Sequence, residues 1–155
     1  MTTIEVSKKD IIKALETEPK LFSGAWALTK RRSDAGLARI KVADDCRVCA
    51  VGAVMRSVLA PTQPAKAIVR AALAATDGAQ ALTYADYAKV ELRAGRPMAA
   101  LSCVFEFAEL RRGWFDKEGE AGRAAATAFV KEHFPKRIRI DIDGARPRKG
   151  VKVIK

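Results

Sequence analysis

Aromatic side chains are scarce in this chain, at 6% of its 155 residues. Proteins that hold single-stranded nucleic acid commonly stack its bases on Phe, Tyr or Trp, so this scarcity argues against a stacking surface. It also implies a core built mainly of Ala, Val, Leu and Ile, because hydrophobic residues still make up 49% of the sequence. That fraction is large enough for a folded core and too large for a disordered chain.

The sequence also lacks a long apolar run. No stretch approaches the roughly 20 apolar residues that a membrane-spanning helix requires. Residues 1–5 are polar and no apolar segment follows them, so we expect no export signal. Three cysteines in a chain without such a signal predict a reducing, cytoplasmic setting.

Motifs of catalysis are missing as well. The sequence contains no phosphate-binding loop, dinucleotide fingerprint or zinc-protease motif. Glu106 and Glu109 lie three residues apart on an expected helix and are followed by Arg111 and Arg112. This spacing is typical of a solvated, ion-paired helix face rather than of an acid–base pair. We therefore expect a non-enzymatic protein without a cofactor.

The few thiols and the one imidazole leave two chemical alternatives open. Cys46 and Cys49 have the Cys-x-x-Cys spacing of redox motifs, and a helix start at this point would lower a thiolate pKa. A redox role nevertheless needs a strand before the motif, and two aspartates just upstream oppose thiolate formation. The second alternative is a zinc site that uses the full supply of ligands, Cys46, Cys49, Cys103 and His133. A single Cys-x-x-Cys is weak evidence for zinc, so we expect no bound metal and buried, packing cysteines.

What the chain does contain is positive charge. Its net charge is +11, and residues 131–155 carry nine Lys or Arg against three Asp or Glu. More than half of the net charge therefore lies in about a sixth of the length. A pI of about 9.9 favours an acidic partner, such as nucleic acid, a nucleoprotein or an acidic protein surface.

The first half and the middle of the chain are predicted to be largely helical. Ser7 begins the first helix, with Asp10 at the capping-box position, and Pro19 ends it. The small residues of Cys49–Val54 should pack against the helix that carries Cys103. Capping and breaking residues predict five further helices, at about 46–59, 62–77, 83–95, 97–113 and 116–133.

Strict alternation from Arg137 to Asp143 predicts a strand, with three isoleucines on its buried face. A turn at 144–150 and a second strand at Val151–Ile154 would complete a basic C-terminal hairpin, residues 136–155. An N-terminal hairpin is expected at 22–42. These two hairpins beside the helices predict an α+β fold, with a predominantly helical core and a small antiparallel sheet, in a single domain spanning residues 1–155.

Short motifs spread over the chain resemble a known class of proteins. They are Phe22-Ser-Gly-Ala-Trp-Ala-Leu, Cys49-Ala-Val-Gly-Ala and Leu101-Ser-x-x-Phe-Glu106. The pattern resembles small proteins of unknown function encoded by phages and other mobile elements, over roughly residues 20–135. The resemblance implies an accessory protein of a mobile genome and transfers no site residues.

We therefore expect a protein that binds an acidic macromolecule and inhibits a host-defence nucleoprotein complex such as a CRISPR effector. Direct nucleic-acid binding with a regulatory role is the alternative, and a zinc or redox protein is a second one. Because exposed charges add little stability, Arg146, Arg148 and Lys149 should serve association more than folding. The residues predicted to contact the partner are Lys30, Arg31, Arg32, Arg137, Arg139, Arg146, Arg148, Lys149 and Lys152.

Overall fold

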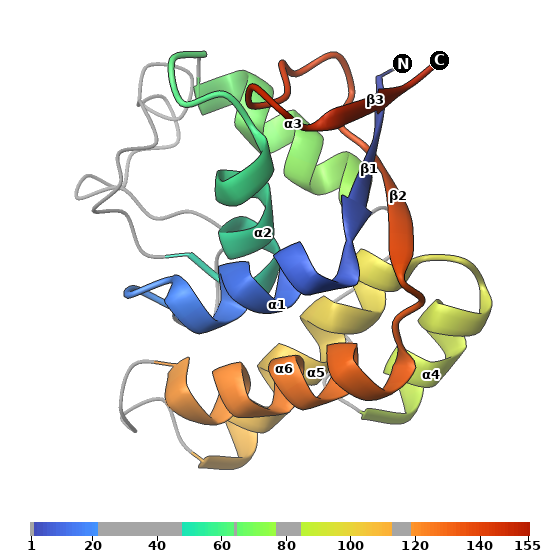
Figure 1. Ribbon diagram of the computed structural model, residues 1–155. Coiled ribbons are helices and arrows are strands. Elements are labelled where there is room, and N and C mark those ends of the chain that lie inside the picture. Colours follow the sequence, from blue (N-terminus) through green and yellow to red (C-terminus); the bar gives the residue numbers. More distant parts are fainter. Residues whose placement is uncertain (1, 22–47, 64, 77–84, 113–118) are drawn as a thin grey trace.

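The computed structural model describes residues 2–21, 48–63, 65–76, 85–112 and 119–155. Within these ranges the chain forms helices beside a three-stranded sheet, which confirms the α+β prediction (Figure 1). The elements are β1 (Thr3–Ser7), α1 (Lys8–Thr17), α2 (Ala50–Val58), α3 (Ala65–Ala75), α4 (Ala85–Arg93), α5 (Pro97–Arg112), α6 (Glu120–His133), β2 (Arg137–Asp141) and β3 (Lys152–Ile154).

Five of the helices lie close to where their capping residues predict them. Ser7 is the N-cap of α1, and its Oγ accepts a hydrogen bond from the Asp10 backbone N–H at 3.1 Å. This bond satisfies one of the free amides at the helix start. The prediction for α2 was wrong at its beginning. Val48 forms an isolated bridge with Leu21 and Cys49 is the extended N-cap, so the helix begins only at Ala50.

The predicted C-terminal strands exist, but the predicted hairpin between them was wrong. β1 lies in the centre of the sheet, and β2 and β3 each pair with it in antiparallel fashion. The N-terminal segment supplies this partner because Ile4 and Val6 alternate with polar residues and are buried. β1 continues directly into α1, and the two chain ends lie together at one end of the sheet (Figure 1). The predicted N-terminal hairpin at 22–42 lies outside the described residues.

The inner face of the sheet joins the helical core. Ile138, Ile140 and Ile142 are buried, as predicted, together with Ile4 and Val6. β2 contacts α3, while α1 packs on α6 and α2. α5 lies between α4 and α6 and also contacts α2. The predicted packing of α2 on α5 is thereby confirmed, and this arrangement leaves the other face of the sheet in solvent.

Candidate anion-binding face

The solvent-exposed face of the sheet collects three of the predicted contact residues. Residues directly opposite one another on antiparallel strands lie on the same face. The pairing places Arg139 on β2 and Lys152 on β3 opposite Glu5, on either side of β1. Arg137 also reaches Glu5, at the next exposed position along β2. We call this surface, formed by Glu5, Arg137, Arg139 and Lys152, the outer face.

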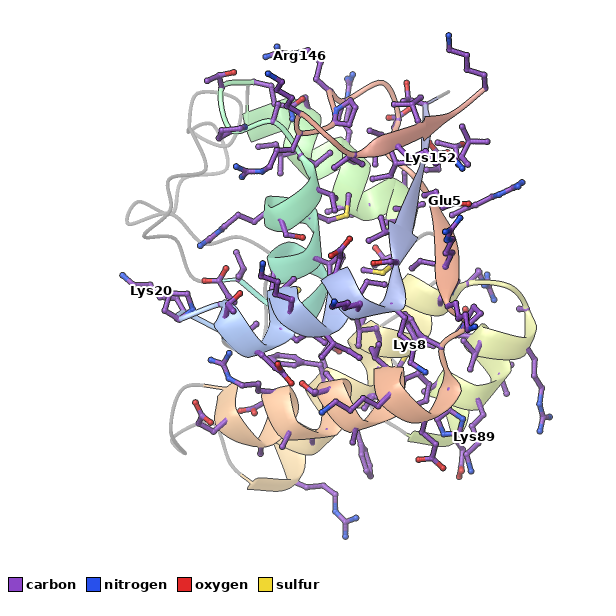
Figure 2. The ribbon with its side chains drawn as sticks, in the orientation of Figure 1. Glu5, Lys8, Lys20, Lys89, Arg146 and Lys152 are labelled. Carbon is purple, nitrogen blue, oxygen red and sulfur yellow. The ribbon has the colours of Figure 1, made fainter. Side chains whose placement is uncertain are left out.

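Glu5 forms ion pairs with cations on both neighbouring strands. Its carboxylate lies 3.5 Å from Arg137 Nη1 and 3.3 Å from Lys152 Nζ. The Glu5 side chain is 17% exposed, whereas those of Arg137 and Lys152 are 68% and 64% exposed. Arg139 has no ion pair with any residue that the structure describes. Arg137 and Lys152 are therefore much more exposed to solvent than the carboxylate that they share (Glu5 and Lys152 are labelled in Figure 2).

A polar hollow of about 410 Å³ lies along the outer face. Glu5 and Lys152 line it on the sheet, and Ser7 and Asp10 line it at the start of α1. It forms where the pairing between β1 and β3 ends, because β3 pairs only with the Thr3–Glu5 part of β1. The hollow therefore has charged groups of both signs in its lining.

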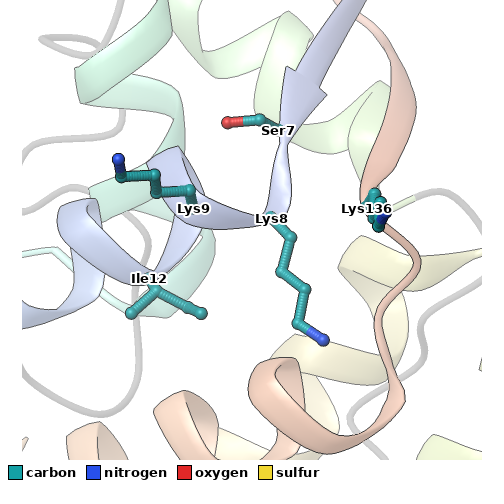
Figure 3. Close-up of a pocket in the computed structure, with 5 residues that line it drawn as sticks. All are labelled: Ser7, Lys8, Lys9, Ile12 and Lys136. Atoms are coloured by element: carbon teal, nitrogen blue, oxygen red, sulfur yellow. The ribbon is translucent and has the colours of Figure 1, made fainter.

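A second hollow, of about 360 Å³, adjoins the first at Ser7 and was missed by sequence reasoning (Figure 3). Lys8, Lys9 and Lys136 surround it, and Ile12 lines its base. The Lys8 Nζ donates to the Lys131 carbonyl at 2.5 Å, at the end of α6, so this lysine also supports the fold. The cue in the sequence was the pair of lysines immediately after the N-cap Ser7. The surface of this hollow is almost entirely apolar, because Ile12 and the aliphatic stems of the lysines form it.

The loop between β2 and β3 holds the other predicted cations, and it is anchored rather than free. Buried Gln63 accepts from the Arg146 backbone N–H at 2.8 Å, and its Nε2 donates to the Arg146 and Ala60 carbonyls at 3.0 and 2.8 Å. The Arg148 backbone N–H donates to the Val58 carbonyl at 2.6 Å. This backbone hydrogen bond fixes the loop to the end of α2.

The Arg148 side chain also has a role in the fold. Its Nη2 donates to the Arg56 carbonyl at 2.9 Å, in the last turn of α2. A guanidinium at a helix C-terminus satisfies a free carbonyl and opposes the negative end of the helix dipole. Lys149 has no side-chain partner among the described residues and is exposed.

The predicted contact residues thus fall into two groups rather than one. Arg137, Arg139 and Lys152 share the outer face, while Arg146 and Arg148 lie beside the end of α2. Figure 2 shows Arg146 and Lys152 apart, on different elements. The predicted cations Lys30, Arg31 and Arg32 lie outside the described residues.

The expectation of a solvated face at Glu106 and Glu109 was wrong. Glu109 is buried, and its carboxylate accepts from the Gly122 backbone N–H of α6. Glu106 is partly buried, and desolvation raises the pKa of its carboxyl. The error arose because α5 is covered by neighbouring helices on several sides. The spacing of its charged residues therefore does not indicate a solvent-exposed face.

The described thiols are buried, as predicted. Burial raises the pKa of Cys49 to about 12, and burial also raises the pKa of Cys103. Among the described residues, no three His, Cys, Asp or Glu side chains come close enough together to hold a metal ion. Cys46 lies outside the described residues, so the redox and zinc alternatives that use it stay predictions.

In the described part of the chain, no helix is both long and apolar enough to cross a bilayer. No protein-family model, curated protein or solved structure matches this sequence. The resemblance to phage and mobile-element proteins therefore stays a prediction.

Proposed function

We propose that this protein is a non-catalytic binder of a polyanion, and that the outer face contacts the phosphate backbone of a nucleic acid, either free or within a nucleoprotein complex. The observation that carries the proposal is the gathering of Arg137, Arg139 and Lys152 on one exposed face of the sheet. Arg and Lys side chains are the usual partners of phosphate groups, and Arg can bind two phosphate oxygens at once.

The support beneath these cations favours this function. Ile138 and Ile140 alternate with Arg137 and Arg139 along β2 and are buried in the core. The strand is therefore held in place while the charged ends of its arginines remain in solvent. Backbone contacts of this kind carry little sequence information, so we expect binding to be strongly salt-dependent and nearly indifferent to base sequence.

The composition of the face also bears on the form of the nucleic acid. The strands β1, β2 and β3 contain no Phe, Tyr or Trp. Because these strands have no aromatic ring on which a base can stack, we expect the outer face to bind a single strand no more tightly than a duplex. The more specific prediction, that the partner is a host-defence complex such as a CRISPR effector, rests on the resemblance and on charge alone.

The test is a titration of labelled nucleic acid, followed by fluorescence anisotropy. The probes are a 20-base-pair DNA duplex of two unrelated sequences, a single strand of equal length, and polyglutamate as a protein-like polyanion. We expect the two duplexes to bind equally, with a dissociation constant of about 1–100 μM near physiological salt and a steep loss as salt rises. Absence of binding to every nucleic acid at 50 mM salt contradicts the proposal. Tighter binding of polyglutamate than of the duplexes would indicate that the partner is an acidic protein instead.

A further inference from the structure

The position of Glu5 constrains how the outer face can hold an anion. Adjacent strands in a sheet lie about 4.8 Å apart, so side chains on β2 and β3 start about 10 Å from each other with β1 between them. Arg137 and Lys152 converge nevertheless, because both reach the Glu5 carboxylate. The point where these two cations meet is therefore already occupied by a negative group that belongs to the protein.

We propose that Glu5 is an internal competitor that limits the affinity of the outer face for polyanions. A phosphate that binds Arg137 and Lys152 together must take the place of the Glu5 carboxylate or lie next to it. In the first case two ion pairs are broken, and in the second two like charges are brought together. Either cost lowers affinity, and the first does not arise at Arg139, which forms no ion pair with a described residue. This inference rests on the proposed function, because it concerns the same face.

The role can be isolated by removing one charge without changing the shape of the side chain. In Glu5→Gln the side chain keeps its length, and the Arg137 and Lys152 side chains are released. We expect the variant to bind the 20-base-pair duplex about threefold to tenfold more tightly than the natural protein, since exposed ion pairs are individually weak. Glu132→Gln is the matched control. It removes the same charge from α6, where Glu132 is 75% exposed and lies beside His133.

A double-mutant cycle shows whether the gain passes through the two cations. In a background that carries Arg137→Gln and Lys152→Gln, the effect of Glu5→Gln should fall to that of the Glu132→Gln control. A purely long-range charge effect would instead leave the gain unchanged in both backgrounds. Thermal melting of each variant checks that the sheet is intact, and Glu5→Thr, which favours a strand, provides a second neutral variant.

Elution from heparin, a polyanion that is not a nucleic acid, separates the two hypotheses. If Glu5→Gln elutes at higher salt than Glu132→Gln, but no variant binds nucleic acid, the inference about Glu5 stands and the proposed function fails. If the natural protein binds the duplex and Glu5→Gln behaves like Glu132→Gln with both probes, the proposed function stands and the inference fails. Equal elution together with no duplex binding overturns both.

Discussion

Arg148 combines two roles at the scale of a single residue. It belongs to the basic segment predicted to bind a partner, yet its guanidinium donates to the Arg56 carbonyl at the end of α2. Lys149, the next residue, carries the same charge in the same loop without a described side-chain partner. A comparison of these two adjacent residues therefore distinguishes the effect of a positive charge from the effect of the hydrogen bond.

We predict that Arg148→Gln lowers the melting temperature by about 1–5 °C, because the variant lacks a capping hydrogen bond and a favourable dipole interaction worth about 0.5–1.5 kcal/mol. Lys149→Gln should change it by less than about 1 °C, since isolated surface charges contribute little. Differential scanning calorimetry of both variants makes the comparison. Equal melting temperatures would show that the Arg148 contact does not stabilise the fold.

The buried thiols allow a chemical test at the same scale. The thiolate is the reactive form of cysteine, and burial raises the pKa of Cys49 to about 12, so this thiol stays protonated at neutral pH. We predict that Cys49 and Cys103 resist iodoacetamide at pH 7.5 in the folded protein and react fully in denaturant. Peptide mass spectrometry reads each site separately, and Cys46→Ser removes the third thiol. Rapid alkylation of Cys49 under native conditions would contradict the described packing.

Sequence reasoning at single positions succeeded where one local interaction decides. The N-cap of Ser7 and the buried faces of Ile138 and Ile140 follow from patterns within a few residues. Gln63 was not predicted, because its partner Arg146 lies far along the chain. An isolated glutamine in a sequence gives no sign that it will be buried against a distant backbone.

At the scale of elements, the contact between α5 and α6 depends on Gly122. A Cβ atom built at this position would lie 2.7 Å from Phe105 Cε2 and 2.9 Å from Glu109 Cγ. Phe105 is fully buried, so its ring has little room to move. Although alanine favours a helix over glycine, the close approach of the two helices makes the small residue necessary at this point.

We therefore predict that Gly122→Ala destabilises the protein by about 1–3 kcal/mol, the usual effect of overpacking a core. Urea denaturation monitored by circular dichroism measures the change in the free energy of unfolding. Ala124→Gly, at an exposed position of the same helix, serves as a control that changes helix propensity without affecting the core. A stabilised Gly122→Ala variant would mean that α5 and α6 are less closely packed than described.

The strands show what sequence patterns convey about elements and what they omit. Alternation predicted β2 correctly, since period-two burial is a local property, and the turn residues before β3 predicted that a second strand follows. The sequence did not predict their pairing, because the choice between a hairpin and two separate ladders depends on β1, at the other end of the chain. The polar appearance of residues 1–5 concealed the buried Ile4 that makes β1 a central strand.

At the scale of the whole molecule, the main feature is the position of the exposed cations on the sheet. Because β1 is the central strand, Glu5 from one end of the chain lies between Arg137 and Lys152 from the other end. Sequence composition predicted an acidic partner, but it could not place Arg137 and Lys152 on either side of Glu5. That placement follows from strand order, which only the fold determines.

The most direct test asks whether position or total charge governs binding to nucleic acid. One variant combines Arg139→Gln with Lys152→Gln on the outer face, and the other combines Lys89→Gln with Arg93→Gln on α4, where both residues are exposed. The two variants have the same net charge. Anisotropy titrations of the 20-base-pair duplex are made at several salt concentrations for each variant and for the natural protein.

We predict that the outer-face variant binds more than about tenfold more weakly at 100 mM salt, and that the slope of log affinity against log salt becomes shallower by about 2, one for each phosphate-binding cation that the variant removes. The α4 variant should stay within about threefold of the natural protein and keep its slope. An equal fall in affinity in the two variants would contradict the account, because the positive charge of the outer face would then have no more effect on binding than charge elsewhere on the surface.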